Sequence, residues 1–479
     1  MRRYRNFSSL ALSLIMLTGC EVGPDYKRPP ISMPDLSANE EIKKFIEEKW
    51  WKTFADSTLN SLEEQALKHN SNLKQAIENI EIAHEMAGVA LSDLLPSLGL
   101  TGSGSKAFVS QNGKSYMLGS NAKRGVRLYQ TAASTSYELD FFGKYRRAKE
   151  AALAELLSTR AAKELTLLTV TAEVAKTYFQ LRALDAKRAI AQKTLKTRQE
   201  TCAVFRSRFI NGYCTELDYL RVQAEMSSVR ATVLNLESAQ AKVETALSIL
   251  IGTSPKDMIS RRTAKDQAIE KLRIPSRVPS GIPSDILARR PDILMAEAQL
   301  IAANAQIGVA RAAYFPSISL TGVFGFESKS LASLFNAGSN TWNFIGEASL
   351  PIFSGGKIDA MNKIAEANYR KMLISYEGTI RTAFKETLDA LMSDRKNREI
   401  VIFRTRQVNS LKKGYYIAKK QKDSGLIGLL DLLDVERGLL AAEMELVDAL
   451  QNQLNSVVDL CKALGGGWSI SSWNKISYR

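Results

Sequence analysis

One cysteine near the start of the chain stands where covalent chemistry is expected. Cys20 ends the stretch "LTGC", which follows Arg2, Arg3, Arg5 and an apolar run over residues 10–17. That run is shorter than the roughly 20 apolar residues that span a bilayer, so it indicates a cleaved secretory signal. Small residues directly before the cysteine are typical of a bacterial lipobox, in which the thiolate is acylated and the chain is cut before the cysteine. We therefore expect Cys20 to carry a covalent N-terminal lipid.

The residue after Cys20 indicates where such a lipoprotein would go. Glu21 would be the second residue of the mature chain, and it is not the aspartate that commonly retains lipoproteins at the inner membrane. An outer-membrane address is the expectation. The plainer alternative is a chance cysteine behind a cleaved signal.

Other residues that could do chemistry are few and badly placed for it. His69 and His84 have no carboxylate or cysteine constellation beside them, and no P-loop, GxSxG, HExxH or dinucleotide fingerprint occurs. Cys202, Cys214 and Cys461 show no CxxC spacing. We predict no enzyme activity, no metal site, no disulfide and no cofactor other than the lipid.

The charge of the chain raises the question of nucleic acid. The formal net charge is +15, and removing the three signal arginines leaves +12 for the mature chain. The basic residues are scattered along expected helical faces, and an exported chain rarely meets nucleic acid. A solvated basic surface is the preferred interpretation.

The elements around these residues form an internal repeat. "GVALSDLLPSLGLTG" aligns with "GVARAAYFPSISLTG" when Pro96 is placed on Pro316, an offset of 220. Further along, the "GK" at Gly143 aligns with the "GK" at Gly356, an offset of 213. The chain is therefore a duplication whose halves differ by seven residues, a difference that we expect in a loop.

Each half is expected to contain an unusually long helix. Residues 144–211 contain no glycine or proline and are rich in helix-forming residues, which predicts a helix about 100 Å long. Residues 357–422 predict its counterpart, with Gly378 and Gly414 as places where it could bend. Two shorter helices laid end to end would flank each long one, over 58–94 and 215–251 in the first half and 284–314 and 429–464 in the second.

Between the short and long helices of each half, the sequence alternates as strands do. Ile318, Leu320, Phe324 and Phe326 share one face, and a second apolar series, Trp342, Phe344, Ala348, Leu350 and Ile352, follows. The first half repeats the pattern more weakly around Leu100 and Tyr137. The strands are long enough to cross a membrane, although the edge of a soluble sandwich would look similar. Four strands cannot close a membrane barrel, so the barrel would be shared between two or three copies.

Several motifs together resemble one family. "CEVGPDYKRPP", "LARRPDILMAEAQLIAANAQIGVARAAYFPSISLTG", "ASLPIFSGGK" and "FRSRFINGYCTELDYL" look like the outer membrane factor family, the TolC-like channels, and specifically its NodT/OprM-type lipoproteins. The resemblance runs from Cys20 to about residue 464. It implies an α+β membrane protein: a homotrimer with a twelve-stranded transmembrane β-barrel, four strands per protomer, continuous with a long periplasmic α-helical barrel.

The repeat and the resemblance together divide the chain. The expected segments are a lipoprotein signal peptide (1–19), a lipid-anchored extended tether and equatorial segment (20–56), repeat 1 (57–251), an equatorial linker (252–283), repeat 2 (284–464) and an equatorial tail (465–479). Closely spaced prolines after Cys20 favour extended backbone, so we expect a semi-rigid tether along the outside of the tunnel.

The resemblance also implies a function and partners. It implies the outer membrane channel of a tripartite export system, most simply for small molecules or drugs, located in the outer membrane of a Gram-negative bacterium. Its partners would be a periplasmic adaptor (membrane fusion) protein, an inner-membrane pump of the resistance-nodulation-division type and outer membrane lipid. Two alternatives stay open, which are an outlet for type I protein secretion and, in a different class, a lipid-anchored coiled-coil scaffold.

The two turns at the far ends of the repeats are expected to contact the adaptor. Gly212 and Gly425 occupy equivalent positions, and both are followed by "LD". The alternative is that these glycines only turn the chain. The candidate contact residues are Arg206, Arg208, Gly212, Leu217, Asp218, Leu220, Gly425, Leu430 and Leu433.

The resemblance assigns a periplasmic gate to two aspartates in "LLDLLD". Asp431 and Asp434 are three residues apart and share a helical face. A trimer would bring six carboxylates together, which should raise their pKa values and attract cations. Alternatively, one or both are solvated or cap the returning helix. Lys422 and Ile427 stand where other members latch the entrance with a tyrosine and an arginine, so Lys422 could instead pair with Asp218 or Asp423.

Overall fold

The computed structural model describes residues 21–30, 49–108, 125–254, 269–272, 274 and 289–467, and the following account concerns these residues. The signal peptide and Cys20 lie outside them. The chain divides into two compact units. Unit 1 is Met1–Pro30, Ile80–Ser158 and Ala296–Tyr376, and unit 2 is Ile31–Asn79, Thr159–Met295 and Glu377–Arg479. The units do not follow the repeats, because the longest helices contribute residues to both.

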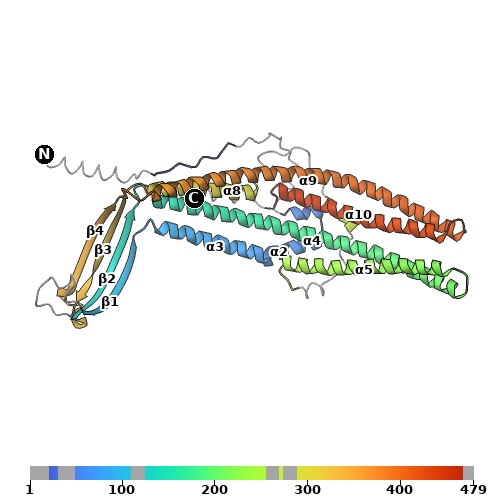
Figure 1. Cartoon of the computed structure of the whole chain (residues 1–479), viewed down its shortest axis with the longest axis horizontal. Coiled ribbons are helices and arrows are strands. Elements are labelled where there is room, and N and C mark those ends of the chain that lie inside the picture. Colours follow the sequence, from blue (N-terminus) through green and yellow to red (C-terminus); the bar gives the residue numbers. More distant parts are fainter. Residues whose placement is uncertain are drawn as a thin grey trace. The chain divides into compact units, whose positions relative to one another are not determined.

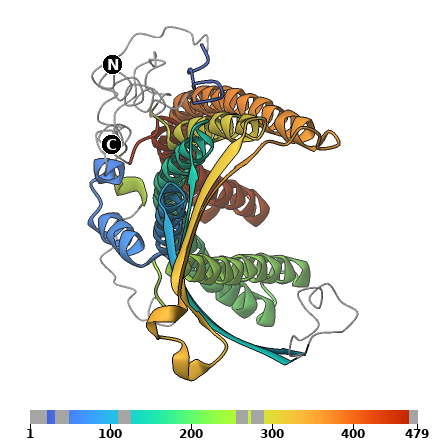
Figure 2. The same cartoon turned by 90° about the vertical axis from the view of Figure 1, so that its left-hand side faces the viewer.

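Unit 1 contains a sheet of four antiparallel strands (Figure 1). The strands are β1 (Ser97–Phe108), β2 (Gly125–Leu139), β3 (Ser317–Ser328) and β4 (Asn340–Ser349), and they pair in the order β1-β2-β3-β4. Two short 3-10 turns, η5 (Leu331–Ser333) and η6 (Ala337–Ser339), connect β3 to β4. The strands that alternation predicts in both halves are confirmed, and Figure 2 shows them side by side in a curved sheet.

The pairing of the strands separates an apolar face from a polar face. Phe324 is opposite Trp342, and Ile318 is opposite Ala348. One residue further along, Ser319 is opposite Glu347. Since successive side chains of a strand point to opposite faces, the two sets lie on opposite sides of the sheet.

Two helices of 67 residues confirm the expectation of abnormal length. They are α4 (Lys144–Ile210) and α9 (Lys357–Asp423), and each is about 100 Å long. Gly378 and Gly414 both lie inside the continuous α9. The shorter helices are α5 (Glu216–Leu250), α8 (Pro291–Ala312) and α10 (Leu429–Ala463).

The helix predicted over 58–94 is two helices, so that prediction is wrong at one point. α2 (Ser57–His69) and α3 (Ser71–Ser92) are separated by Asn70, which is buried and has extended backbone. The Asn70 Oδ1 accepts hydrogen bonds from the backbone of Asn72 and Leu73, and its Nδ2 donates to the carbonyl of Leu250 at 2.8 Å. The asparagine therefore caps α3 and ties this break to the end of α5.

The hydrophobic core of unit 2 begins at the turn η2 (Trp50–Phe54). Trp50 and Phe54 are fully buried, and the ring of Phe54 lies 5.0 Å from that of Phe179 on α4. Asp56 caps α2 and also accepts a hydrogen bond from the hydroxyl of Tyr178 at 2.8 Å. The aromatic turn and α2 are thereby fixed to the middle of α4. A further short turn, η4 (Ile269–Lys271), adds Ile269 and Leu272 to this core.

Helix α8 is the one described helix long and apolar enough to cross a membrane. Half of its apolar window is buried inside the protein, as in a packed core helix.

Candidate functional site

The outer edges of the four-stranded sheet are open. β1 and β4 are its outer strands, and within the described residues neither has a second neighbour. Leu98, Leu100 and Trp342 on these edges are each more than 70% exposed. An outer strand offers unpaired N–H and C=O groups, which a membrane interior does not tolerate. The edges therefore need another strand if the sheet lies in lipid.

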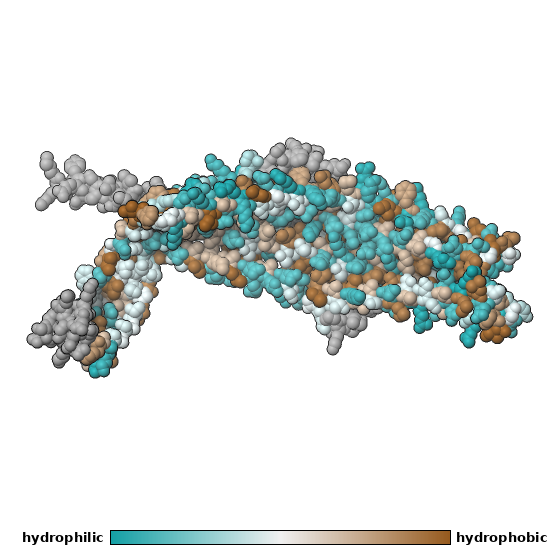
Figure 3. Space-filling view, viewed as in Figure 1, coloured by the Kyte–Doolittle hydropathy of each residue, from teal (hydrophilic) through white to brown (hydrophobic). Residues whose placement is uncertain are grey.

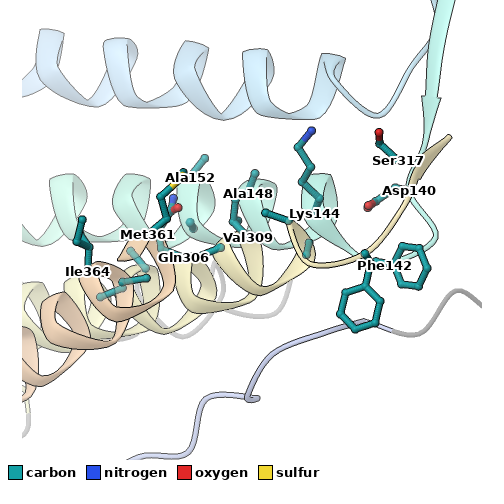
Figure 4. Close-up of a pocket in the computed structure, with 18 of the residues that line it drawn as sticks. Asp140, Phe142, Lys144, Ala148, Ala152, Gln306, Val309, Ser317, Met361 and Ile364 are labelled. Atoms are coloured by element: carbon teal, nitrogen blue, oxygen red, sulfur yellow. The ribbon is translucent and has the colours of Figure 1, made fainter. Parts of the chain in front are cut away.

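A broad hollow of about 1300 Å³ lies in unit 1 where the strands meet the helices (Figure 4). Small side chains such as Ala148 and Ala152 on α4 line it, together with Gln306 on α8 and Met361 on α9. At the strand end, Lys144 bonds the carboxylate of Glu138 at 3.1 Å and fixes the turn from β2 into α4. The lining is mostly apolar, with Glu138, Asp140 and Lys144 at the strand end.

The residues that follow Cys20 are docked on unit 1. We call residues 21–30 the strap; it is non-helical, as predicted, but it is held in place and is not a free tether. The backbone N–H of Val22 donates to the carbonyl of Phe142 at 3.1 Å. The buried guanidinium of Arg147 lies 3.4 Å from Glu21 and donates to Asp25 at 2.6 Å. The strap thus begins at the junction between β2 and α4.

The strap also crosses α8 closely. A Cβ atom added to Gly23 would lie 2.6 Å from the Cα atom of Gly308, so the two backbones approach as only glycines allow. Farther along, the Tyr26 hydroxyl donates to Glu297 at 3.3 Å, and Arg28 pairs with the same carboxylate. The strap therefore joins the start of α4 to α8 within unit 1.

The two predicted turns have the same backbone motif. Gly212 has φ +76° and Gly425 has φ +74°. In each turn the N–H after the glycine donates to the carbonyl five residues earlier, at 2.7 Å in the first turn and 2.8 Å in the second. This is the Schellman ending of a helix, with glycine where the left-handed conformation is required. The repeat is preserved in the geometry of both turns.

The turns expose most of the predicted contact residues, and apolar residues gather at this end of unit 2 (Figure 3). Asp218 is half-buried and accepts a 2.7 Å hydrogen bond from Thr215, which caps α5. Leu433 is only 2% exposed, so the prediction that it contacts a partner is wrong. The exposed members are Arg206, Arg208, Gly212, Leu217, Leu220, Gly425 and Leu430.

A groove of about 550 Å³ lies between α4 and α5 beside the first turn. Arg206 and Ile210 line it from α4, and Tyr219 and Met226 line it from α5. The groove is mixed in character, because Gln199, Ser207, Asn211 and Gln223 also line it.

The two proposed gate aspartates have different environments in the protomer. Asp431 accepts a hydrogen bond from the Gly428 backbone N–H at 3.0 Å and so caps α10. Asp434 has 81% of its side chain exposed and lies 3.9 Å from Arg437. Arg437 also pairs with Glu225 on α5 at 3.2 Å. The capping alternative is therefore realised for Asp431, whereas the carboxylate of Asp434 is solvated.

Comparison with known proteins identifies the family. The outer membrane efflux protein family matches residues 62–253 and 282–466, one segment in each repeat. This chain belongs to that family. The cation efflux system protein CusC of Escherichia coli O6:H1 is 32% identical over 95% of this chain and 97% of its own length. The antibiotic efflux pump outer membrane protein ArpC of Pseudomonas putida is 34% identical over 97% of this chain and 96% of its own length.

The fold of this outer membrane efflux protein is also that of solved channels. The structure of the Campylobacter jejuni CmeC outer membrane channel matches with a TM-score of 0.87 and 30% identity, covering 96% of this chain and 98% of the other. The resemblance seen in the sequence motifs is confirmed. The protein is accordingly placed in the outer membrane of Gram-negative bacteria, within a family of transport proteins.

Sequence reasoning missed a buried charge cluster in this efflux protein. Arg198 on α4 is 1% exposed and pairs with Glu436 on α10 at 2.9 Å. Burial and the nearby, hydrogen-bonded Glu436 raise the pKa of Tyr415 on α9 to about 12. The cluster joins three helices from both repeats. No local signal could have found it, because its members are far apart in the sequence.

The motif "ARRPD" gains a structural explanation. Arg290 is buried and pairs with Asp292 at 2.7 Å and with Glu386 on α9 at 2.6 Å. It also donates to the carbonyl of Ala463 at the end of α10. Arg290 therefore joins α8, α9 and α10.

The described residues hold no cluster of three or more His, Cys, Asp or Glu that could bind a metal ion.

Proposed function

We propose that three copies of this chain form an export channel, each giving four strands to a twelve-stranded barrel and its long helices to a periplasmic tunnel. The observation that carries the proposal is a four-stranded sheet with one polar face, one apolar face and two open edges. The smallest single-chain membrane barrels have about 8 strands, so four must combine with strands of other copies. The alternative of a coiled-coil scaffold does not account for these strands.

The channel would be the outer component of a tripartite efflux system with an adaptor protein and an inner-membrane pump. Relatives that share this architecture over nearly their whole length are named for different cargo, cations in one case and antibiotics in another. Such variety favours a passive conduit whose substrates are chosen mainly by the pump. We assign a pump of the resistance-nodulation-division type and small-molecule efflux to this chain.

The lipid on Cys20 would anchor the protein where the strands meet the helices. Glu21, the next residue, pairs with Arg147 at the start of α4. A lipid attached one residue earlier would then enter the membrane near the barrel wall. Its acyl chains add about 0.8 kcal/mol per buried methylene group.

The turns at Gly212 and Gly425 would dock the adaptor, and Asp431 and Asp434 would ring the entrance. The exposed residues Leu217, Leu220 and Leu430, and the groove beside Arg206, support the docking surface. The exposed carboxylate of Asp434 supports the ring.

Photocrosslinking in cells tests this assembly. A photoreactive amino acid at Leu217, Leu220 or Leu430 should capture the adaptor, because these side chains are exposed at the turns. The same probe at the buried Leu433 is the matched control and should capture little. Capture only from probes in the equatorial segments would refute docking at the turns, and mass spectrometry of the captured complexes should find a resistance-nodulation-division pump.

A further inference from the structure

We propose that β1 of one copy pairs antiparallel with β4 of a second copy in one defined register. In this register Phe108 is opposite Trp342, and Ser103 is opposite Glu347. The inference rests on the proposed multichain barrel and adds the residue pairs that close it.

The first support is that the strand register within the β1–β2 hairpin is the same as that within the β3–β4 hairpin. Ser97 is opposite Ser136 in the β1–β2 pair, and Ser317 is opposite Ser349 in the β3–β4 pair. The offset of 220 carries Ser97 to Ser317, and the offset of 213 carries Ser136 to Ser349. The two hairpins are therefore the same hairpin in register, so a pair seen in one repeat predicts its counterpart in the other.

The β2–β3 pair is the joint between one repeat and the next. Ser134 is opposite Val323, and Tyr129 is opposite Ser328. In the repeat, β4 is the counterpart of β2, and β1 is the counterpart of β3. The pairing of β2 with β3 within one chain therefore predicts the pairing of β4 with the β1 of another copy. The same offsets then carry Ser134 and Val323 to Glu347 and Ser103. They carry Tyr129 and Ser328 to Trp342 and Phe108.

The faces of the sheet agree with this register. Trp342 lies on the apolar face with Phe324. Phe108 lies on the same face, because pairing through β2 sets Leu100 and Phe324 both opposite Ala133, and Phe108 is an even number of residues from Leu100. A shift of one residue would turn every apolar side chain of one strand toward the polar face. A shift of two residues keeps the faces, but in one direction it sets Trp342 opposite Lys106, and in the other it places Trp342 beyond Phe108, where β1 ends.

The exposed side chains on the two edges complement each other in this register. Phe108 is 72% exposed and Trp342 is 74% exposed, and they would form a cross-strand aromatic pair. Leu100 and Leu350, both exposed, would also lie opposite each other. Because each edge complements the other edge of the same chain, the occupant is a second copy of this protein.

The ends of the strands point the same way. β2 has a neighbour on both sides and continues to Leu139, whereas β4, with a neighbour on one side, stops at Ser349. The counterpart of Ser349 in β2 is Ser136, three residues before the end of that strand. Pro351 follows Leu350 and has no backbone N–H, so it also limits β4; a neighbouring β1 would pair with Leu350 but would not form a full ladder through the proline.

Cysteine crosslinking in the full-length, lipidated protein tests the register. The background carries Cys202→Ser, Cys214→Ser and Cys461→Ala so that the introduced thiols are the only reactive ones. On-register pairs are Ser103→Cys with Glu347→Cys on the polar face and Gly102→Cys with Ala348→Cys on the apolar face. Both faces are tested because hydrogen-bonded and non-hydrogen-bonded pairs alternate along an antiparallel ladder. A side chain at Gly102 meets no atom within 4 Å.

The matched controls keep the same face and move one cysteine by two residues. They are Ser103→Cys with Ile345→Cys and Ser105→Cys with Glu347→Cys. A mild oxidant in membranes should join copies into covalent oligomers through at least one on-register pair, because directly opposite Cβ atoms lie about 4.5–5.5 Å apart. The off-register pairs should give only traces.

Three results would overturn the inference in distinguishable ways. Crosslinking mainly through an off-register pair shows a closed barrel with a different register. No crosslinking through any pair, while unheated gels still show the oligomer, rules out the β1–β4 joint but not the oligomer. Monomers alone on unheated gels would defeat the proposed function together with this inference.

Discussion

At the scale of single residues, the clearest feature is the charge buried among α4, α9 and α10. Arg198 is almost fully buried and its partner Glu436 is 14% exposed. A buried ion pair need not stabilise a protein relative to apolar residues, but removing one partner leaves an uncompensated charge. Residues 198 and 436 lie in different repeats, so this pair fixes how the return helix of the second repeat sits on the long helix of the first.

Arg198→Ala should lower the free energy of unfolding by about 3–5 kcal/mol, because the largely buried Glu436 carboxylate loses its counter-ion and keeps only its hydrogen bond with Tyr415. Denaturant unfolding of the detergent-solubilised protein measures the loss. Arg381→Ala is the matched control, since Arg381 makes an exposed pair with Glu377 on the long helix α9. The control should change stability by about 1 kcal/mol or less. Equal effects of the two variants would contradict the role given to Arg198.

Glu63 on α2 is a buried acid with a consequence for pH. It is fully buried, and burial raises its pKa well above the ordinary value of 4.5. Above pH 4.5 the unfolded chain loses this proton while the folded chain keeps it. Folding therefore becomes less favourable as pH rises from 4.5 toward the folded pKa, by about 1.4 kcal/mol per pH unit.

Glu63→Gln should remove this pH-dependent loss of stability, because the amide has no proton to lose. We expect the stability of the variant relative to the wild type to increase as pH rises above 4.5. Unfolding midpoints at several pH values measure this trend. Glu64→Gln, at an exposed neighbouring position, is the control and should leave the pH dependence of the wild type intact. A parallel pH profile for Glu63→Gln would contradict the assignment.

The proposed entrance ring gives a prediction for conduction. Replacing Asp431 and Asp434 together with asparagine removes both charges but keeps an oxygen that can accept from the Gly428 N–H. Cation selectivity and block by trivalent cations should both fall in planar bilayers, most strongly at low salt, where the Debye length is longest. Asp423→Asn, also near the turn, serves as the charge control. If the double variant keeps wild-type selectivity and block, the ring lies elsewhere.

At the scale of elements, the regular pattern of the sequence was a good guide. The residues from 144 to 211 predicted one long helix, and in the structure α4 ends at Ile210. The alternation after Pro316 predicted β3. Both follow from local composition and periodicity. The break at Asn70 was not predictable, because its amide is satisfied by the carbonyl of Leu250, far along the chain.

Contacts that depend on how the helices pack could not be predicted from the sequence either. "LLDLLD" places leucines on several sides of α10, and only the neighbouring helices decide that Leu433 is buried while Leu430 is exposed. The strap is another case, since its prolines predicted an extended chain. Its docking depends on Arg147 and on the close approach to Gly308.

The strap leads to a prediction about the anchor. Cys20→Ser should abolish incorporation of a palmitate analogue, while the strands and strap remain able to form channels. We expect trimers at lower yield, measured on unheated gels of outer-membrane extracts. Cys202→Ser is the control and should keep the label. Wild-type protein without label at Cys20 would contradict the lipoprotein assignment.

At the scale of the whole molecule, the duplication accounts for the architecture. Two repeats supply equivalent hairpins, equivalent long helices and equivalent turns, and within the described residues the sheet has two open edges, which further copies complete in the proposed barrel. When copies assemble in a ring, every joint between two hairpins brings one repeat beside the other repeat, whether the joint lies within a chain or between two chains. The duplication therefore explains how several copies of one chain can form a closed channel.

Electron cryo-microscopy of the full-length protein, extracted from outer membranes, tests this central claim most directly. The predicted result is a particle with threefold symmetry, in which twelve strands enclose a pore that continues into a tunnel of helices. A particle with another symmetry would contradict the trimer. A particle whose strands enclose no pore would contradict the channel.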